Sequence, residues 1–146
     1  MIGLDTNVLA RYYTAAGSKD DAATARQCEA ARQLIESGKR LMVSQTVALE
    51  LEWVLRGAYG VQADEVQAVF LHLLSLSHVE FEDRVAVQAA ASCLSIGFGF
   101  ADVLHHGAYR RCSSMATFDD KGFAKRAKKA GLKPAVSLLQ QTASKP

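Results

Sequence analysis

Several features that define other classes of protein are scarce or missing in this chain. Only 2 of its 146 residues are proline, which leaves no room for a proline-rich linker. No apolar run approaches the ~18 residues that a membrane-spanning helix needs, so we expect no membrane association. No basic leader precedes an apolar stretch at the start, so we expect no secretory signal.

Cysteine is also scarce, and its spacing excludes two common uses. Cys28, Cys93 and Cys112 are odd in number and form no CxxC pair, which argues against a zinc site and a disulfide framework. Each lies at an apolar position of a helical pattern, so we expect buried thiols. A reducing, cytoplasmic location fits this pattern.

The composition is that of a folded globular chain, with 49% apolar and 22% charged residues. We expect a single domain over residues 1–140 and a frayed tail over residues 141–146. The net charge of +2 is unevenly distributed. Residues 1–73 carry 7 Lys/Arg against 9 Asp/Glu, and residues 74–146 carry 10 against 6.

Short apolar segments alternate with longer amphipathic patterns, which predicts an α/β fold with a parallel sheet between helices. The expected strands are residues 1–4, 41–43, 79–81, 114–116 and 135–136. The expected helices are residues 21–37, 45–57, 63–76, 84–96 and 120–130, with one more beginning near Asp102.

Four acidic residues adjoin these elements and are candidates for one site. Asp5 follows the first strand, Asp119 follows the strand at 114–116, Asp102 begins a helix, and Glu50 borders the apolar stripe of the helix at 45–57. In parallel sheets, ligands bind at the carboxyl ends of the strands. Carboxylates that converge there repel one another unless a cation lies between them. The pattern therefore predicts a metal-dependent reaction on a phosphate.

Simpler roles remain open for each of these acids. Asp5 and Asp102 could be helix caps, and Glu50 could be a solvated flank of its helix. Either Asp119 or Asp120 could cap the last helix. We assign Asp119 to the site and treat Asp120 as a possible auxiliary. If the strands at 1–4 and 114–116 are neighbours, Asp5 and Asp119 reach the same edge of the sheet.

Small polar residues at the strand ends could orient a carboxylate or a water, although a turn hydrogen bond is an equal alternative. These supporting candidates are Thr6, Asn7, Ser44 and Thr117. His105 and His106 lie on the same helix face as Asp102, but Mg²⁺ prefers oxygen ligands, so packed or partly exposed histidines are the favoured interpretation.

Residues 110–133 are strongly basic, with eight Lys/Arg against two Asp. A solvated helix face explains much of this charge. The alternative is a basic rim that attracts the phosphate backbone of a nucleic acid beside an acidic pocket. Candidate contacts to the RNA backbone are Arg110, Arg111, Lys121 and Lys125.

Four segments, taken in order, resemble a known family. MIGLDTNVL at the start, VSQTVALEL at 43–51, FADVL at 100–104 and ATFD at 116–119 look like a PIN-domain protein. The length and motif order resemble the toxin ribonucleases of VapC-type toxin–antitoxin modules. The resemblance covers about residues 1–138. His105, His106 and Gly107 depart from the small apolar run often seen there, and the first loop, at residues 15–21, is long.

The resemblance implies a three-layer α/β/α sandwich with a central parallel sheet of four to five strands. It implies an endoribonuclease dependent on Mg²⁺, or on Mn²⁺, with Asp5, Glu50, Asp102 and Asp119 as the catalytic acids. Asp5, Asp102 and Asp119 are then the direct metal ligands. The resemblance also implies a homodimer, an RNA substrate and a cognate antitoxin protein that blocks the acidic groove.

Two other classes of function compete with this interpretation. A non-catalytic RNA- or partner-binding PIN-like domain would use the same acids only as caps and flanks. A phosphatase with an aspartyl nucleophile needs a second Asp two positions after the first, and this chain has Asn7 there.

Overall fold

The computed structural model describes residues 1–14 and 21–140, which form an α/β fold. The strands are β1 (Ile2–Gly3), β2 (Leu41–Val43), β3 (Val79–Phe81), β4 (Ser114–Thr117) and β5 (Ala135–Leu138). The helices are α1 (Thr6–Tyr13), α2 (Ala22–Ile35), α3 (Gln45–Gly57), α4 (Ala63–Ser75), α5 (Arg84–Cys93), the 3-10 turn η1 (Leu94–Ile96), α6 (Phe100–Ala108) and α7 (Phe123–Ala130). None of these helices has the length and apolar character needed to cross a membrane.

The strands pair in parallel but form two separate sheets. The first sheet has the order β1-β2-β3, and the second contains only β4 and β5 among the described residues. The five predicted strands and their parallel direction are confirmed, apart from small differences at their ends. The predicted single sheet of four to five strands is wrong, because β4 does not lie beside β1.

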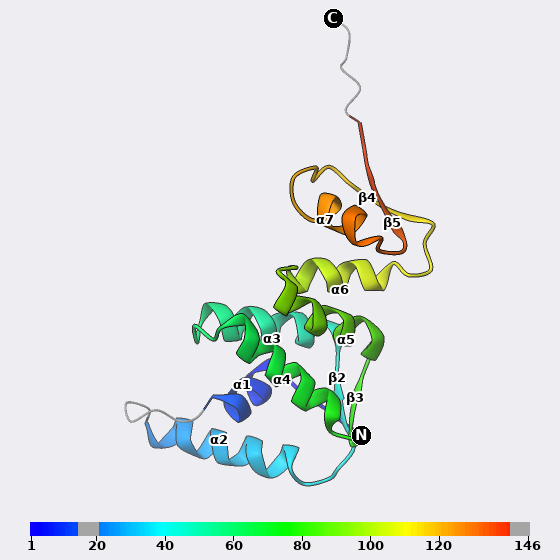
Figure 1. The fold of residues 1–146 in the computed structure, drawn as a ribbon. Coiled ribbons are helices and arrows are strands. Elements are labelled where there is room, and N and C mark those ends of the chain that lie inside the picture. The colour runs from blue at the N-terminus through cyan, green and yellow to red at the C-terminus, as the bar shows by residue number, and fades with distance from the viewer. Residues whose placement is uncertain (15–20, 141–146) are drawn as a thin grey trace, which may run out of the picture.

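The separation follows from where residues 114–138 pack, a segment of β4, α7 and β5 that we call the C-terminal unit. Figure 1 shows α5 and α6 between this unit and the β1–β3 sheet. The unit is held on α6 and η1: the buried His106 donates from Nε2 to the Pro134 carbonyl at 2.8 Å, and Arg126 donates to the Gly97 carbonyl at 3.2 Å. The Phe123 ring packs edge-on against Phe98 and His106.

The helices pack around the first sheet as their apolar patterns predict. Leu9, Leu51 and Phe70 are fully buried, and the Phe70 and Phe100 rings stack at 4.6 Å between α4 and α6. The pattern at 84–96 splits into α5 and the short turn η1, since Gly97 ends the turn with a φ of +82°. This core fixes α1, α3 and α6, which carry three of the four candidate acids: Asp5 caps α1, Glu50 lies in the middle of α3, and Asp102 lies in the first turn of α6.

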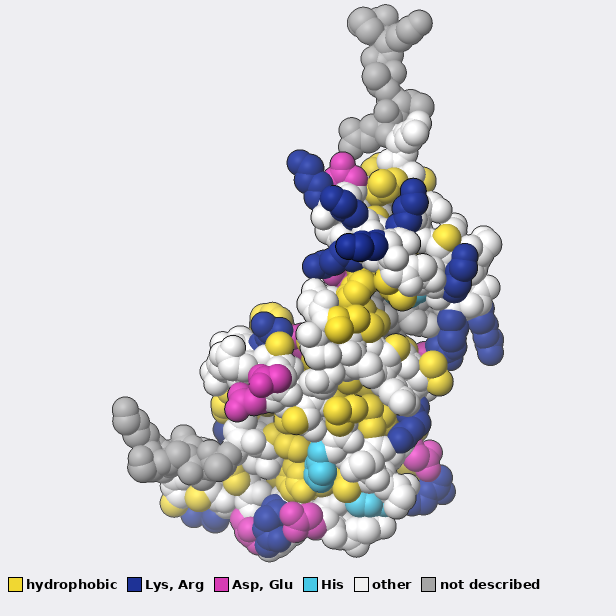
Figure 2. Space-filling view, viewed as in Figure 1, with side chains coloured by type: hydrophobic (Ala, Val, Ile, Leu, Met, Phe, Trp, Pro, Cys, Tyr) yellow, Lys and Arg dark blue, Asp and Glu magenta, His cyan; other side chains and the backbone are white. Residues whose placement is uncertain are grey.

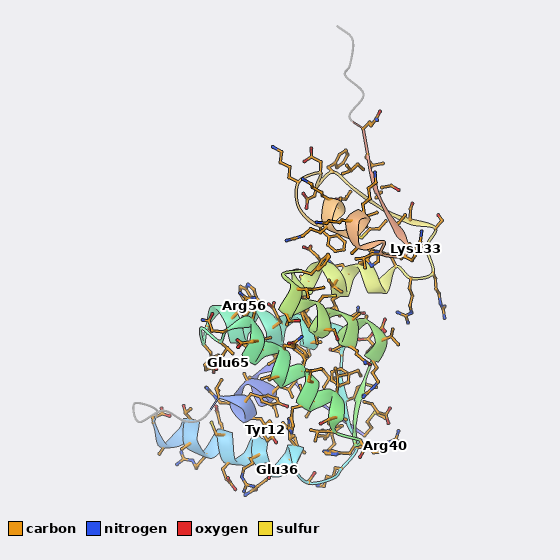
Figure 3. The ribbon with its side chains drawn as sticks, viewed as in Figure 1. Tyr12, Glu36, Arg40, Arg56, Glu65 and Lys133 are labelled. Carbon is orange, nitrogen blue, oxygen red and sulfur yellow. The ribbon has the colours of Figure 1, made fainter. Side chains whose placement is uncertain are left out.

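Helix α1 is held against α2 on the side away from the sheet. Tyr12 on α1 and Glu36, just after the end of α2, lie close together in Figure 3. Partial burial, followed by the Glu36 carboxylate, raises the pKa of Tyr12 above its usual value. Leu9 and Ala10 of α1 are buried, so the core holds the helix and with it Asp5 and Thr6 at its beginning.

The cysteines are less buried than the sequence predicts. Cys28 and Cys93 are half-buried in α2 and α5, and burial raises the pKa of the Cys93 thiol. Cys112 is exposed in the turn between α6 and β4, so the expectation of a third buried helical thiol is wrong. The apolar periodicity there ends with α6 and does not extend to residue 112.

We predict that Gly107→Ala destabilises the protein by about 1–3 kcal/mol, because the new methyl overpacks the α5–α6 contact. A Cβ at Gly107 would lie 2.9 Å from the Ala86 Cβ and 3.3 Å from the Ala86 Cα. Urea unfolding followed by circular dichroism measures the change.

The matched control is Gly57→Ala at the end of α3, where an added Cβ meets nothing within 4 Å. This variant should gain roughly 0.5–1 kcal/mol, because alanine loses less backbone entropy than glycine on entering a helix. Equal effects at the two positions would show that the α5–α6 contact is not tight.

Candidate active site

A threonine at the beginning of α1 joins two of the predicted acids. Asp5 caps α1, and its Oδ1 accepts a hydrogen bond from the Thr6 amide at 2.8 Å. The Thr6 hydroxyl donates to Oε2 of Glu50 on α3, also at 2.8 Å. Thr6 is only 4% exposed, so its rotamer is fixed by packing. Asp5 and Glu50 are distant in sequence, yet one buried residue positions both carboxylates.

The two carboxylates line a pocket of about 190 Å³. Its other walls come from α1, α3 and the segment after α3, and its lining residues are Asp5, Thr6, Asn7, Ala10, Arg11, Glu50, Val54 and Tyr59. Both acids are exposed to solvent, whereas Thr6 and Ala10 beneath them are buried. The pocket therefore offers two solvent-facing carboxylates on a rigid base.

Asp102 lies in the first turn of α6 and is partly buried. Its carboxylate lies close to Gly99: a Cβ added at Gly99 would be only 3.1 Å from Asp102 Oδ2. An acid in this first turn is favoured by the helix dipole. Its neighbour Ala101 lines a groove together with Glu50, so α6 begins beside the α3 acid.

Asp119 lies on the C-terminal unit, away from the other acids. Its carboxylate accepts from the amides of Gly122 at 2.8 Å and Phe123 at 3.1 Å, which caps the start of α7. The bond from Gly122, followed by that from Phe123, lowers the pKa of Asp119 below its usual value. Asp119, rather than Asp120, is therefore the capping acid. Asp120 is exposed and lines a groove with Phe118 and Leu138.

The expectation that four acids meet around one cation is not met within a single chain. Among residues 1–14 and 21–140, no three His, Cys, Asp or Glu side chains lie close enough to hold one ion. The prediction placed Asp5 and Asp119 at one edge if β1 and β4 were neighbours, and these two strands lie in separate sheets. The structure brings Asp5 and Glu50 together and leaves Asp119 apart.

Of the supporting residues, two make local turn hydrogen bonds. Ser44 caps α3 by accepting from the Val47 amide at 3.2 Å, and Thr117 Oγ1 accepts from the Asp119 amide at 3.1 Å. Thr6 and Asn7 line the acid pocket. His106 is a packed core residue and His105 is exposed, which agrees with the expectation of packed or exposed histidines.

The residues predicted to contact the RNA backbone differ in whether they already bind other groups of the chain. Arg110 pairs with Asp83 and also donates to the Gly107 carbonyl. Arg111, Lys121 and Lys125 are exposed. Figure 2 shows lysine and arginine side chains gathered over the C-terminal unit. The basic surface is therefore on the same unit as Asp119.

Sequence reasoning missed Arg11, which lines the acid pocket. Its Nε donates to Gln27 at 3.0 Å and its Nη1 donates to the Tyr59 hydroxyl at 3.0 Å, so the guanidinium is fixed between α2 and the segment after α3. A signal was present in the sequence: Arg11 follows Asn7 by one helical turn and so shares its face. A fixed guanidinium beside carboxylates is suited to contact a phosphate.

Trp53 was also missed as a site residue. It is 72% exposed and lines a mostly apolar groove of about 360 Å³ with Leu49, Glu52 and Ala101. Glu50 forms part of both this groove and the acid pocket, so the two adjoin. Partial burial raises the pKa of Glu52 in the same groove. An exposed indole next to a carboxylate pocket offers a stacking surface for an aromatic ligand.

Two carboxylates of the acid pocket are oxygen donors of the kind that a hard cation prefers. Mg²⁺ commonly keeps several waters and binds through one or two carboxylates together with substrate phosphate. Asp5 and Glu50 supply two such carboxylates, oriented by Thr6. The other two predicted direct ligands, Asp102 and Asp119, do not line this pocket.

A family model described as "PIN domain" matches residues 2–129. The chain belongs to the PIN-domain family. PIN domains are generally nucleases, and the family fits an α/β fold with a parallel sheet. Searches of curated proteins and of solved structures gave no match.

We predict that Asp119 stabilises the PIN domain in a pH-dependent way. Because its pKa is lowered by the α7 amides, its contribution is present above the usual Asp value and is lost as pH falls through the folded value. Asp119→Ala should therefore lower the thermal midpoint at neutral pH, and this difference should shrink in acid.

Asp119→Asn serves as the control, because asparagine keeps one of the two oxygens that accept from the Gly122 and Phe123 amides and does not titrate. The difference in midpoint between Asp119→Asn and Asp119→Ala should stay constant between neutral pH and acid. A wild-type advantage over Asp119→Ala that does not change with pH would contradict a charged cap.

Proposed function

We propose that this PIN domain is a metal-dependent endoribonuclease. The supporting observation is the pair of carboxylates, Asp5 and Glu50, held in one pocket by the buried Thr6. The pocket lies just beyond the carboxyl end of β1, where ligands of parallel sheets bind. The family is one of nucleases, and the pocket provides the oxygen donors that Mg²⁺ or Mn²⁺ prefers.

A bound divalent cation supplies an activated water and neutralises charge on the phosphate. Asp5 and Glu50 would hold that cation, directly or through its waters. Thr6 fixes Glu50 through its hydroxyl and Asp5 through its amide, so neither carboxylate has to reorganise. Arg11 provides a positive charge on the pocket wall for a phosphate oxygen, and Tyr59 orients it.

Two further surfaces support RNA as the substrate. The basic side chains of the C-terminal unit offer a sequence-independent attraction for a polyanion, among them Lys121 and Lys125. Trp53 stands exposed beside Glu50, where a base next to the cut phosphate could stack.

We also propose that the protein acts as the toxin of a toxin–antitoxin pair. The support is the order and spacing of the four acidic motifs in a chain of this length, which resemble VapC-type toxins. The corresponding partners are a cognate antitoxin that covers the acidic pocket and a second copy of the chain.

A second candidate function is a non-catalytic PIN-like domain that binds RNA or a protein partner. One observation favours it: among the described residues of one chain, only Asp5 and Glu50 share the pocket, and no three candidate ligands cluster. This alternative expects binding without cleavage and no dependence on a divalent ion.

We predict that Asp5→Asn lowers RNA cleavage at least about 100-fold while leaving the fold intact, because it removes a charged oxygen donor from the pocket. EDTA should abolish the wild-type activity, and excess Mg²⁺ should restore it. Gel analysis of a labelled single-stranded RNA measures both effects, and circular dichroism checks the fold.

The matched control is Asp64→Asn, which changes an exposed acid in the first turn of α4, outside the pocket. It should cleave RNA at the wild-type rate. Full cleavage by folded Asp5→Asn protein, or cleavage that survives EDTA, would exclude the proposed chemistry. Binding of RNA without any cleavage by the wild type would favour the non-catalytic alternative.

We predict that RNA binding quenches the fluorescence of Trp53, which is the only tryptophan in the chain. The titration uses a short single-stranded RNA and the Asp5→Asn protein, so that no cutting occurs. Trp53→Ala should weaken binding by about 1–3 kcal/mol, and Trp53→Phe should lose much less because it keeps a ring for stacking. Unchanged fluorescence together with unchanged affinity of Trp53→Ala would remove Trp53 from the RNA site.

A further inference from the structure

A groove between α3 and α6 adjoins the acid pocket on the side of Glu50. Four of its lining residues follow one another at i, i+3, i+4 and i+7 and therefore share one face of α3. They are Thr46, Leu49, Glu50 and Trp53, and Ala101 contributes from α6. The volume of about 360 Å³ is within the roughly 300–1,000 Å³ of small-molecule sites. Because Glu50 lines both cavities, a ligand in this groove lies next to whatever the acid pocket holds.

The indole of Trp53 is the stacking surface of this groove. It is 72% exposed, although tryptophan is on average a highly buried residue type. Leu49 beside it is half-buried and adds an apolar flank. An exposed aromatic ring stacks nucleobases of every kind, because each base has a π-face. Stacking on Trp53 therefore attracts single-stranded RNA but gives little preference among the four bases.

Glu52 supplies the same groove with a charged acceptor. Its side chain is only 14% exposed, and this burial raises the pKa of Glu52, an effect that the positive charge of Arg56 opposes. Arg56 approaches the carboxylate to 3.9 Å, which is an ion-pair distance but too long for a hydrogen bond. Arg56 therefore balances part of the charge without using the lone pairs of the carboxylate. A partly buried carboxylate of this kind is stabilised by N–H groups of a ligand.

The four bases differ in what they present to a carboxylate. The Watson–Crick edge of guanine has two adjacent donors, N1–H and N2–H, which match the two oxygens of a carboxylate. Adenine and cytosine each present one amino donor beside an unprotonated ring nitrogen, which repels the second oxygen. Uracil presents one N–H between two carbonyl oxygens. Guanine is therefore the base whose Watson–Crick edge forms two parallel hydrogen bonds with a carboxylate.

We propose that this groove binds a guanine base of single-stranded RNA, with the ring stacked on Trp53 and the Watson–Crick edge bonded to Glu52. This inference rests on the proposed nuclease function and specifies its base preference. Because Glu50 joins the groove to the acid pocket, the guanine belongs to one of the two nucleotides at the cleaved bond. The RNA is single-stranded at this point, since a paired guanine already uses the same edge for cytosine.

Cleavage of matched RNAs tests the base preference. The substrates are end-labelled oligouridylates that carry one guanine, one inosine, one adenine or no substitution at a central position. Cutting should occur at a bond that flanks the guanine, with kcat/KM at least about tenfold above that of the adenine and all-uridine RNAs. Inosine is guanine without the N2 amino group, so it keeps the ring for stacking and loses one hydrogen bond. Its kcat/KM should lie between those of guanine and adenine.

Glu52→Gln separates base recognition from cutting. Glutamine keeps the shape of the side chain but has one acceptor oxygen, so the ratio of kcat/KM between the guanine and inosine RNAs should fall toward one. Asp64→Asn, which changes an exposed acid of α4 outside the groove, is the matched control and should keep the wild-type ratio. Circular dichroism checks that both variants are folded.

Equal cutting of the guanine and all-uridine RNAs by the wild type would overturn the guanine site and leave the nuclease function standing. A wild-type ratio of guanine to inosine cutting in folded Glu52→Gln would also overturn it, since Glu52 would then not read the base. Absence of any cleavage by the wild type would instead count against the proposed function, and a binding measurement then decides the guanine site.

The binding measurement follows the fluorescence of Trp53, the only tryptophan, in the Asp5→Asn protein, whose substitution lies outside the groove. The guanine RNA should quench the indole with an affinity at least about tenfold higher than that of the all-uridine RNA. Equal affinities would rule out the guanine site. A second copy of the chain is the competing occupant. An emission shift that depends on protein concentration without RNA would show that a second copy covers Trp53, which also excludes RNA from the groove.

Discussion

The candidate site depends on the two hydrogen bonds of Thr6. Its amide is bonded to Asp5 and its hydroxyl to Glu50, so one buried residue couples the end of β1 to the face of α3. The coupling needs both the strand that delivers residue 5 and the packing of α1 against α3. Leu9 and Leu51, fully buried on those helices, help to hold this packing. The rigidity of the core therefore sets the distance between two carboxylates that are themselves solvent-exposed.

The position of Asp119 is decided by a different part of the structure. Its carboxylate binds the α7 amides, and the unit that carries it is anchored on α6 and η1 through His106 and Arg126. Three of the four candidate acids, Asp5, Glu50 and Asp102, therefore lie in the body of the PIN domain, and only Asp119 lies on the basic C-terminal unit.

Much of the fold follows from local sequence patterns. The strands, and helices α2, α3 and α4, begin and end close to the predicted residues, because apolar periodicity and caps such as Ser44 act over a few residues. Local patterns place Asp5, Thr6 and Asn7 at a strand end and Glu50 on a helix face, but their convergence in one pocket depends on the packing of α1 against α3. In the sequence, Arg11 and Trp53 each lie one helical turn from a candidate residue. That spacing alone does not distinguish a residue of the site from an ordinary surface residue.

The sequence by itself determined which segments are strands and helices and which residue types could bind a cation. It could not determine which strands are neighbours, because parallel pairing between remote segments depends on how the intervening helices pack. Only the tertiary structure decided that β4 lies with β5 on the far side of α6, and that Asp119 caps a helix instead of facing Asp5. The physical reason is that the contacts of His106, Phe123 and Arg126, which hold the C-terminal unit in place, join residues whose proximity no local pattern records.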